Sequence, residues 1–271
     1  MLLLLSCTPE PVIAEATTDP YARHVEAGLL KAPDFTARIE KPWVVFGDGP
    51  KGPLDKRVEG TVRWATVLLK KDYFPQDPPE PVDIWLFQDA KSYESHVTAW
   101  FDEAPDTPYG FANEDGLFMD ISTGGGTLVH EMVHPLMEVN FPACPPWFNE
   151  GLASLYEAVT EHDGHLQGLL NWRLQGLQHH IQVGDLPSFE VLMAQDADAF
   201  YNRDPADNYA QSRYLLYYLQ EQDKLRPYYK AFHDNVEQDP TGYKTLKRVL
   251  EREDMAVFQT EWEAWVLTLK R

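Results

Sequence analysis

The spacing of hydrophobic and polar residues divides the chain into a first half of mixed patterns and a second half of helical ones. Hydrophobic residues three and four apart predict an amphipathic helix over about 54–74, and another helix is expected over 89–101. Runs of β-branched and aromatic residues predict strands at about 41–48, 82–87, 109–112 and 117–121. The last two flank a hairpin signal at 113–116. Beyond residue 126 helices are expected throughout, at about 146–159, 166–182, 208–222, 224–237, 242–251 and 255–269.

These elements predict an α+β protein, with a small mixed sheet and helices in an N-terminal lobe and an all-helical C-terminal lobe. A length of 271 residues suits one large domain or two lobes. We therefore expect a single domain over 21–271, formed by an α/β lobe at 21–140 and a helical lobe at 141–271.

Composition narrows the class of partner. Hydrophobic residues make up 44% of the chain and charged residues 24%, as in an ordinary soluble globular protein. The 43 acidic residues outnumber the 23 basic ones and give a net charge of −20. Because such a charge repels phosphate backbones, we expect no nucleic-acid partner.

The N-terminus carries a separate signal. Leu4-Leu5-Ser6-Cys7 resembles the end of a bacterial lipoprotein signal peptide, which would make Cys7 the lipidated N-terminus. The segment from Thr8 to about Asp19 is rich in Pro, Thr, Ala and Glu and is expected to form a tether. Residues 1–20 are thus predicted to be a lipoprotein-like signal and tether that places the protein in the bacterial cell envelope. A Cys7–Cys144 disulfide is the alternative.

The residues suited to catalysis lie where the two predicted lobes meet. His130 and His134 are four positions apart, so on a helix they share one face and can reach the same metal ion. Glu131 projects about 100° round the helix axis, toward the open side of that ion. This is the HExxH arrangement of zinc peptidases. Glu150, inside the next predicted helix, would complete a ligand set sufficient for catalytic Zn²⁺, with the fourth position left for water.

With the downstream segment Trp147-Phe148-Asn149-Glu150-Gly151-Leu152-Ala153, the HExxH motif resembles gluzincin zinc metallopeptidases, above all the bacterial peptidase MA-like family. The strong match covers about 124–157, and a weaker one covers most of the chain beyond about 40. The resemblance implies a thermolysin-like catalytic core in which His130, His134 and Glu150 bind Zn²⁺. It also implies that Glu131 acts as general base in peptide-bond hydrolysis. Exopeptidase and endopeptidase activity remain open.

The resemblance further implies a peptide or protein substrate, which the edge of the mixed sheet would bind as an added strand. Tyr209, in a Tyr-Ala-Gln-Ser segment similar to that of the family, is the candidate for stabilising the oxyanion. The acidic net charge predicts a cleft that favours cationic or neutral peptides.

Two departures from the family pattern support a different class of function. Pro135 follows His134 directly, and the missing amide predicts that the helix kinks or stops there. Ser154 stands where related sequences often carry a carboxylate that orients a ligand histidine, and Glu157 would compensate only at longer reach. The alternative is a non-catalytic zinc-binding or metal-free surface lipoprotein that binds a partner through its helical lobe.

Overall fold

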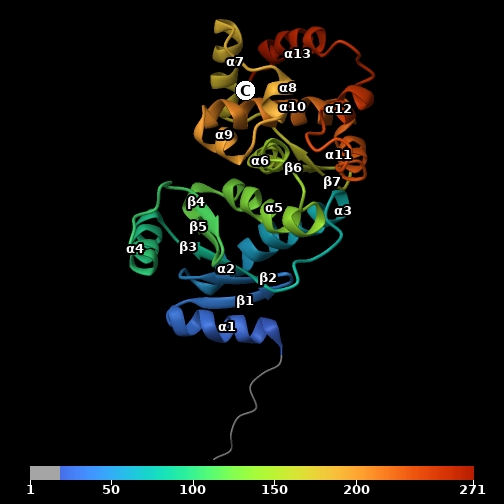
Figure 1. The fold of residues 1–271 in the computed structure, drawn as a ribbon. Helices are drawn as coiled ribbons and strands as arrows, with labels where there is room; N and C mark the ends of the chain where they lie inside the picture. The colour runs from blue at the N-terminus through green and yellow to red at the C-terminus, as the bar shows by residue number, and fades with distance from the viewer. Residues whose placement is uncertain (1–18) are drawn as a thin grey trace, which may run out of the picture.

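The computed structural model describes residues 19–271 (Figure 1). The predicted signal peptide and nearly all of the tether, including Cys7, lie outside these residues. The first half of the described chain forms a five-stranded mixed sheet of order β1-β2-β3-β5-β4. Its strands are β1 (Thr36–Glu40), β2 (Trp43–Gly47), β3 (Val82–Phe87), β4 (Gly110–Asn113) and β5 (Gly116–Asp120). The three central strands are parallel, whereas β1 and β4 pair antiparallel at the two edges.

The sheet is buried on both faces because its central strands are hydrophobic at consecutive positions. Helices α1 (Pro20–Lys31) and α4 (Ala90–Phe101) cover one face, where Phe46, Trp85 and Phe118 lie in an aromatic cluster. On the other face, Val45, Ile84 and other inward-facing residues join the main core of the molecule. That face is covered by a long helical segment, α2 (Lys51–Arg57), η1 (Val58–Arg63) and α3 (Trp64–Asp72), and by α5 (Gly126–Asn140). The short 3-10 helix η2 (Ile121–Thr123) leads from the sheet into α5.

The second half is mainly helical and lies at the opposite end of the molecule from α1, with α5 and α6 between them (Figure 1). Its helices are α6 (Pro146–Leu155), α7 (Arg173–Val183), α8 (Phe189–Met193), α9 (Ala197–Asn202), α10 (Pro205–Glu221), α11 (Leu225–His233), α12 (Tyr243–Leu250) and α13 (Met255–Thr268). The mixed α and β composition predicted from the sequence is confirmed.

The prediction of an all-helical C-terminal lobe is wrong in one segment. Strands β6 (Val159–His162) and β7 (His165–Gly168) form an antiparallel hairpin that overlaps the start of the helix predicted over 166–182. Asp163 and Gly164 turn the chain with φ angles of +51° and +73°. An Asp-Gly pair favours this left-handed turn, which matches the twist of the paired strands. The hairpin delays the start of the following helix to Arg173.

Of the two outcomes expected at Pro135, a kink or a stop, the stop does not occur, because α5 continues to Asn140 with Pro135 inside it. Proline costs the helix one hydrogen bond and about 3 kcal/mol. The residues that follow offset this cost by burial: Leu136 and Met137 are 0% and 1% exposed in the main core. Burying two such side chains contributes about 1.5–3 kcal/mol each.

Helix α6 lies at the centre of this half of the molecule, packed between α5 and α10. Gly151 permits the approach of α10, since a Cβ atom at this position would lie only 3.1 Å from Cβ of Ser212. The carbonyl groups at the end of α6 accept hydrogen bonds from the buried guanidinium of Arg213, including one of 2.9 Å from Nε to Ser154 O. These contacts fix the helix that carries Glu150. Within residues 19–271, no helix is long and apolar enough to cross a membrane.

Candidate metal centre

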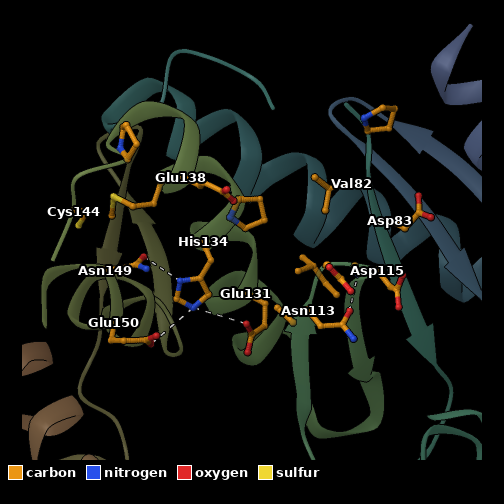
Figure 2. Close-up of a pocket in the computed structure, with 18 of the residues that line it drawn as sticks. Val82, Asp83, Asn113, Asp115, Glu131, His134, Glu138, Cys144, Asn149 and Glu150 are labelled. Carbon is orange, nitrogen blue, oxygen red and sulfur yellow. Dashed lines mark hydrogen bonds and ion pairs between the residues drawn. The ribbon is translucent and has the colours of Figure 1, made fainter. Parts of the chain in front are cut away.

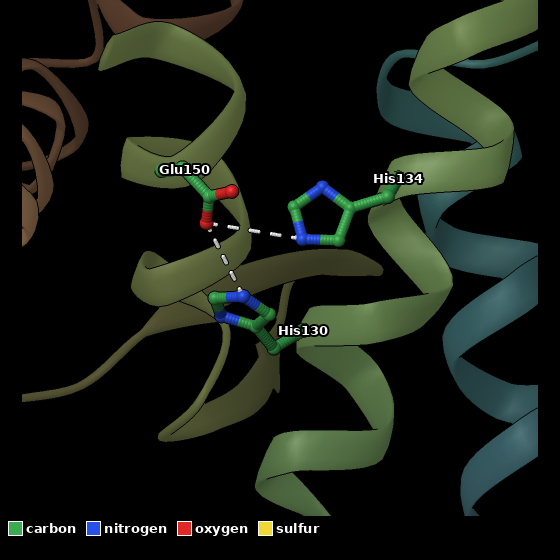
Figure 3. Close-up of side chains that lie close together, drawn as sticks. All are labelled: His130, His134 and Glu150. Atoms are coloured by element: carbon green, nitrogen blue, oxygen red, sulfur yellow. Dashed lines mark ion pairs between the residues drawn. The ribbon is translucent and has the colours of Figure 1, made fainter. Parts of the chain in front are cut away.

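Helix α5 presents His130 and His134 on one face, as their four-residue spacing predicts (Figure 3). Their ring centroids are 5.0 Å apart and their planes are inclined by 75°. His130 is buried, and 21% of the His134 side chain is exposed. The two imidazoles therefore converge on one point at the edge of the core.

Glu150 reaches the same point from α6. Its Oε2 lies 3.4 Å from Nε2 of His130 and 3.8 Å from Nε2 of His134. One ligand atom from each of the three residues falls within 4.8 Å of the others, close enough to hold a metal ion. The structure thus brings together the three residues that the sequence predicts as ligands.

The donor set fits a cation. Glu150 is 5% exposed, and its Oε2 accepts no hydrogen bond in this buried position. Burial alone would raise the pKa of Glu150, but His130 and His134 hold it below its usual range. Burial opposes protonation of His130, yet Glu150 and Glu157 outweigh it and raise the His130 pKa to about 10. A site that retains a proton this strongly has the electrostatics to hold a metal cation in its place.

Each histidine also has an oxygen atom near its other ring nitrogen, hydrogen-bonded at His134 and at ion-pair distance at His130. The amide oxygen of Asn149 lies 3.0 Å from Nδ1 of His134. An amide oxygen can only accept, so Nδ1 is the donor of this bond and Nε2 is the nitrogen that faces Glu150. Oε1 of Glu157 lies 3.4 Å from Nδ1 of His130. Such outer contacts fix the tautomer and the ring orientation of metal ligands.

Glu157 is itself held in place by a network of donors. Arg173 donates to both carboxylate oxygens, from Nε at 3.1 Å and from Nη2 at 2.7 Å. Nδ2 of Asn171 donates a further bond of 2.9 Å. Burial would raise the pKa of Glu157, but His130 and Arg173 lower it to about 2, so the group is ionised. The carboxylate missing at Ser154 is therefore supplied one helical turn further along the chain.

Tyr201 is a site residue that the sequence analysis did not identify. It lies on α9, and its hydroxyl donates a 2.9 Å hydrogen bond to Oε1 of Glu150. Nothing in the local sequence marks this tyrosine, since it meets Glu150 only through the packing of α9 beside α6. The predicted Tyr209 is half-buried beside it, with its ring centroid 6.4 Å from that of Tyr201 and 5.5 Å from that of Phe200, and burial and the nearby Glu150 carboxylate raise its pKa. Tyr209 does not line the cavity described below, whereas Tyr201 does.

The cluster opens onto a cavity of about 730 Å³ between α5, α6 and the β4–β5 turn (Figure 2). Glu131, His134 and Glu150 line it. Oε2 of Glu131 is 3.8 Å from Nε2 of His134, on the cavity side of the histidine pair. The opposite wall includes Ala112 and Asn113 of the edge strand β4. A ligand in this cavity would meet His134 and Glu150 of the cluster, the Glu131 carboxylate and a strand edge together.

Comparison with known proteins adds no family to this description, since neither the models of protein families nor the curated proteins match the sequence.

Proposed function

We propose that this protein is a zinc-dependent peptidase of the gluzincin type, with a thermolysin-like core built from the sheet, α5 and α6. The observation that carries the proposal is the convergence of His130, His134 and Glu150 beside a carboxylate, Glu131, that faces a cavity. Two imidazoles and one carboxylate are a donor set that Zn²⁺ takes in catalytic sites. When bound, the ion supplies a Lewis acid that polarises a carbonyl group and acidifies water.

The chain's own residues would divide the remaining work. Asn149 and Glu157 hold the two imidazoles with Nε2 toward the ion, and Tyr201 holds Glu150. Glu131 accepts a proton from water as its oxygen bonds to the amide carbon. It then gives this proton to the amine nitrogen that leaves when the C–N bond breaks. Tyr209 remains the candidate for a second electrophile, and Tyr201 joins it because its side chain lines the cavity.

Strand β4 offers a binding mode for the substrate. One edge of β4 pairs with β5, and no strand pairs with its other edge in the described part of the chain. An extended peptide could add to this edge and lie along the cavity toward Glu131. The lipid anchor at Cys7 and the location in the bacterial cell envelope belong to the same proposal.

The test has two parts. Elemental analysis of protein purified with sufficient zinc should find about one zinc per chain, lost in His130→Ala. A broad peptide library should then be cleaved by the wild type and not by Glu131→Gln. A chain that binds no zinc would refute the proposal. Bound zinc without cleavage by either protein would favour the non-catalytic binding protein instead.

A further inference from the structure

Acidic side chains dominate the charged groups that line the cavity. Its lining contains six carboxylates and neither Lys nor Arg among the described residues. The carboxylates are Asp83, Glu114, Asp115, Glu131, Glu138 and Glu150. Glu131 and Glu150 belong to the proposed catalytic site, which leaves four for other contacts. The acidic surplus of the chain is therefore present at the cavity itself.

These four carboxylates stand on both sides of the opening. Glu138 lies on α5, one helical turn beyond His134, and is exposed. Across the opening lie Asp83 on β3 and Glu114 and Asp115 in the β4–β5 turn (Figure 2). Among the residues that the structure describes, Asp83 alone of these four has a basic partner, with its Oδ1 2.8 Å from Nδ1 of His24.

The wall between the carboxylates is apolar. It is formed by Val82, Leu117, Pro135, Met137, Phe141 and Pro142. Glu150 lines the same cavity, and its buried Oε2 accepts no hydrogen bond from the described residues. This oxygen lies at the end of the cavity where the three predicted metal ligands converge. The cavity thus combines a catalytic end, apolar walls and an acidic rim.

Lysine and arginine side chains match this combination. Their methylene stems pack along apolar surface while the charged head stays at a polar rim. The rim carboxylates would repel an acidic side chain, which disfavours it. We propose that the cavity selects peptides with a Lys or Arg side chain beside the cleaved bond, a substrate class that rests on the proposed peptidase function. The positive charge of that side chain is recognised by Glu138, Glu114 and Asp115.

The test measures binding separately from cleavage. The probes are blocked peptides, acetylated at the N-terminus and amidated at the C-terminus, identical except for one central residue: Lys, Arg, norleucine or Glu. Binding to zinc-supplemented Glu131→Gln protein is followed by fluorescence anisotropy. The Lys and Arg peptides should bind at least about fivefold more tightly than the norleucine peptide, and the Glu peptide should bind most weakly.

Removal of a single charge locates the effect. On the Glu131→Gln background, Glu138→Gln should weaken binding of the Lys peptide about two- to fivefold and leave the norleucine peptide unchanged. Glu94→Gln is the matched control, because Glu94 is an exposed residue of α4 on the opposite face of the sheet. It should change neither value. The triple variant Glu114→Gln/Asp115→Asn/Glu138→Gln should abolish the preference.

Each other outcome overturns the inference in a defined way. Equal binding of the Lys and norleucine peptides refutes it, and an equal effect of Glu94→Gln would assign the preference to the general charge of the protein. An unblocked norleucine peptide that binds as tightly as the blocked Lys peptide would show that the acids bind a terminal amine. The Lys preference and the Glu138 effect could be found while the wild type cleaves no peptide. That result would refute the proposed peptidase activity and support the inference that the cavity binds cationic side chains.

Discussion

Glu157→Gln should weaken zinc binding about 10- to 70-fold while the protein stays folded. The substitution keeps the size of the side chain and removes its charge. Glu157 lies 3.4 Å from Nδ1 of His130 and only 14% of its side chain is exposed, so little water screens the contact. The variant therefore tests whether this carboxylate orients a metal ligand from a position where the family pattern does not place it.

The magnitude follows from this geometry. Two full charges 3.4 Å apart interact by about 5 kcal/mol at an effective dielectric constant of about 20. An imidazole bound to a metal carries only part of the positive charge, and we take about three tenths to a half of that energy, about 1.5 to 2.5 kcal/mol. This corresponds to the 10- to 70-fold loss and lies within the range known for outer contacts of metal sites.

The assay is competition for zinc with a chromogenic chelator at neutral pH, with thermal denaturation followed in parallel. The glutamine leaves Arg173 without its carboxylate, so some loss of stability is expected. Glu157→Gln/Arg173→Met removes both charges and separates the two effects, because it should regain stability but not zinc affinity. Glu138→Gln is the matched control, since it removes one charge from α5 without touching a ligand. Zinc affinity of folded Glu157→Gln within about threefold of the wild type would refute the reasoning.

Four further substitutions test the supporting structure. Tyr201→Phe removes the hydrogen bond to Glu150, and water will replace part of that bond because 39% of Tyr201 is exposed. We therefore expect zinc affinity to fall about fivefold, and an unchanged affinity would contradict this role. Gly126→Ala would place a Cβ atom 2.0 Å from the carbonyl oxygen of Glu157, so thermal denaturation should show a loss of about 1–3 kcal/mol. Gly176→Ala, in α7 with no atom within 4 Å of the added Cβ, should be neutral or stabilising. Arg213→Met leaves buried carbonyl oxygens at the end of α6 without donors and should cost about 3 kcal/mol of unfolding free energy, and an unchanged melting temperature would contradict this.

The sequence was sufficient to predict that His130, His134 and Glu150 lie together because their pattern is local. Two histidines four residues apart share a helix face whatever surrounds them, and Glu150 follows on the next helix. The partners of these ligands depend on tertiary packing. Tyr201 is 51 residues from Glu150 and meets it only because α9 packs beside α6. Arg173 likewise reaches Glu157 only after the β6–β7 hairpin has returned the chain.

Rules based on the local sequence also failed where the burial of apolar side chains outweighed them. Pro135 correctly signals a lost hydrogen bond, but the rule does not count the apolar surface that Leu136 and Met137 bury beyond it. The β6–β7 hairpin was missed because the helix predicted from residue 166 was begun inside β7, and the segment around Asp163-Gly164 between the two predicted helices was assigned no strand. The turn preference of that pair was the stronger signal, since only a few residue pairs adopt two consecutive positive φ angles readily.

The geometry of the cluster bears on the choice between an enzyme and a binding protein. A structural zinc site is closed by four protein ligands, usually with thiolates among them. In the described part of the chain the cluster has three, and Cys144, which lines the same cavity, is not one of them. Its Sγ instead lies 3.6 Å from the carbonyl oxygen of Pro145.

A structural zinc site would also not require Glu131, a carboxylate that faces the cavity beside the ligands. A three-ligand cluster with a free carboxylate on its open side is the arrangement expected where a reacting molecule enters, which favours the peptidase over the non-catalytic alternative.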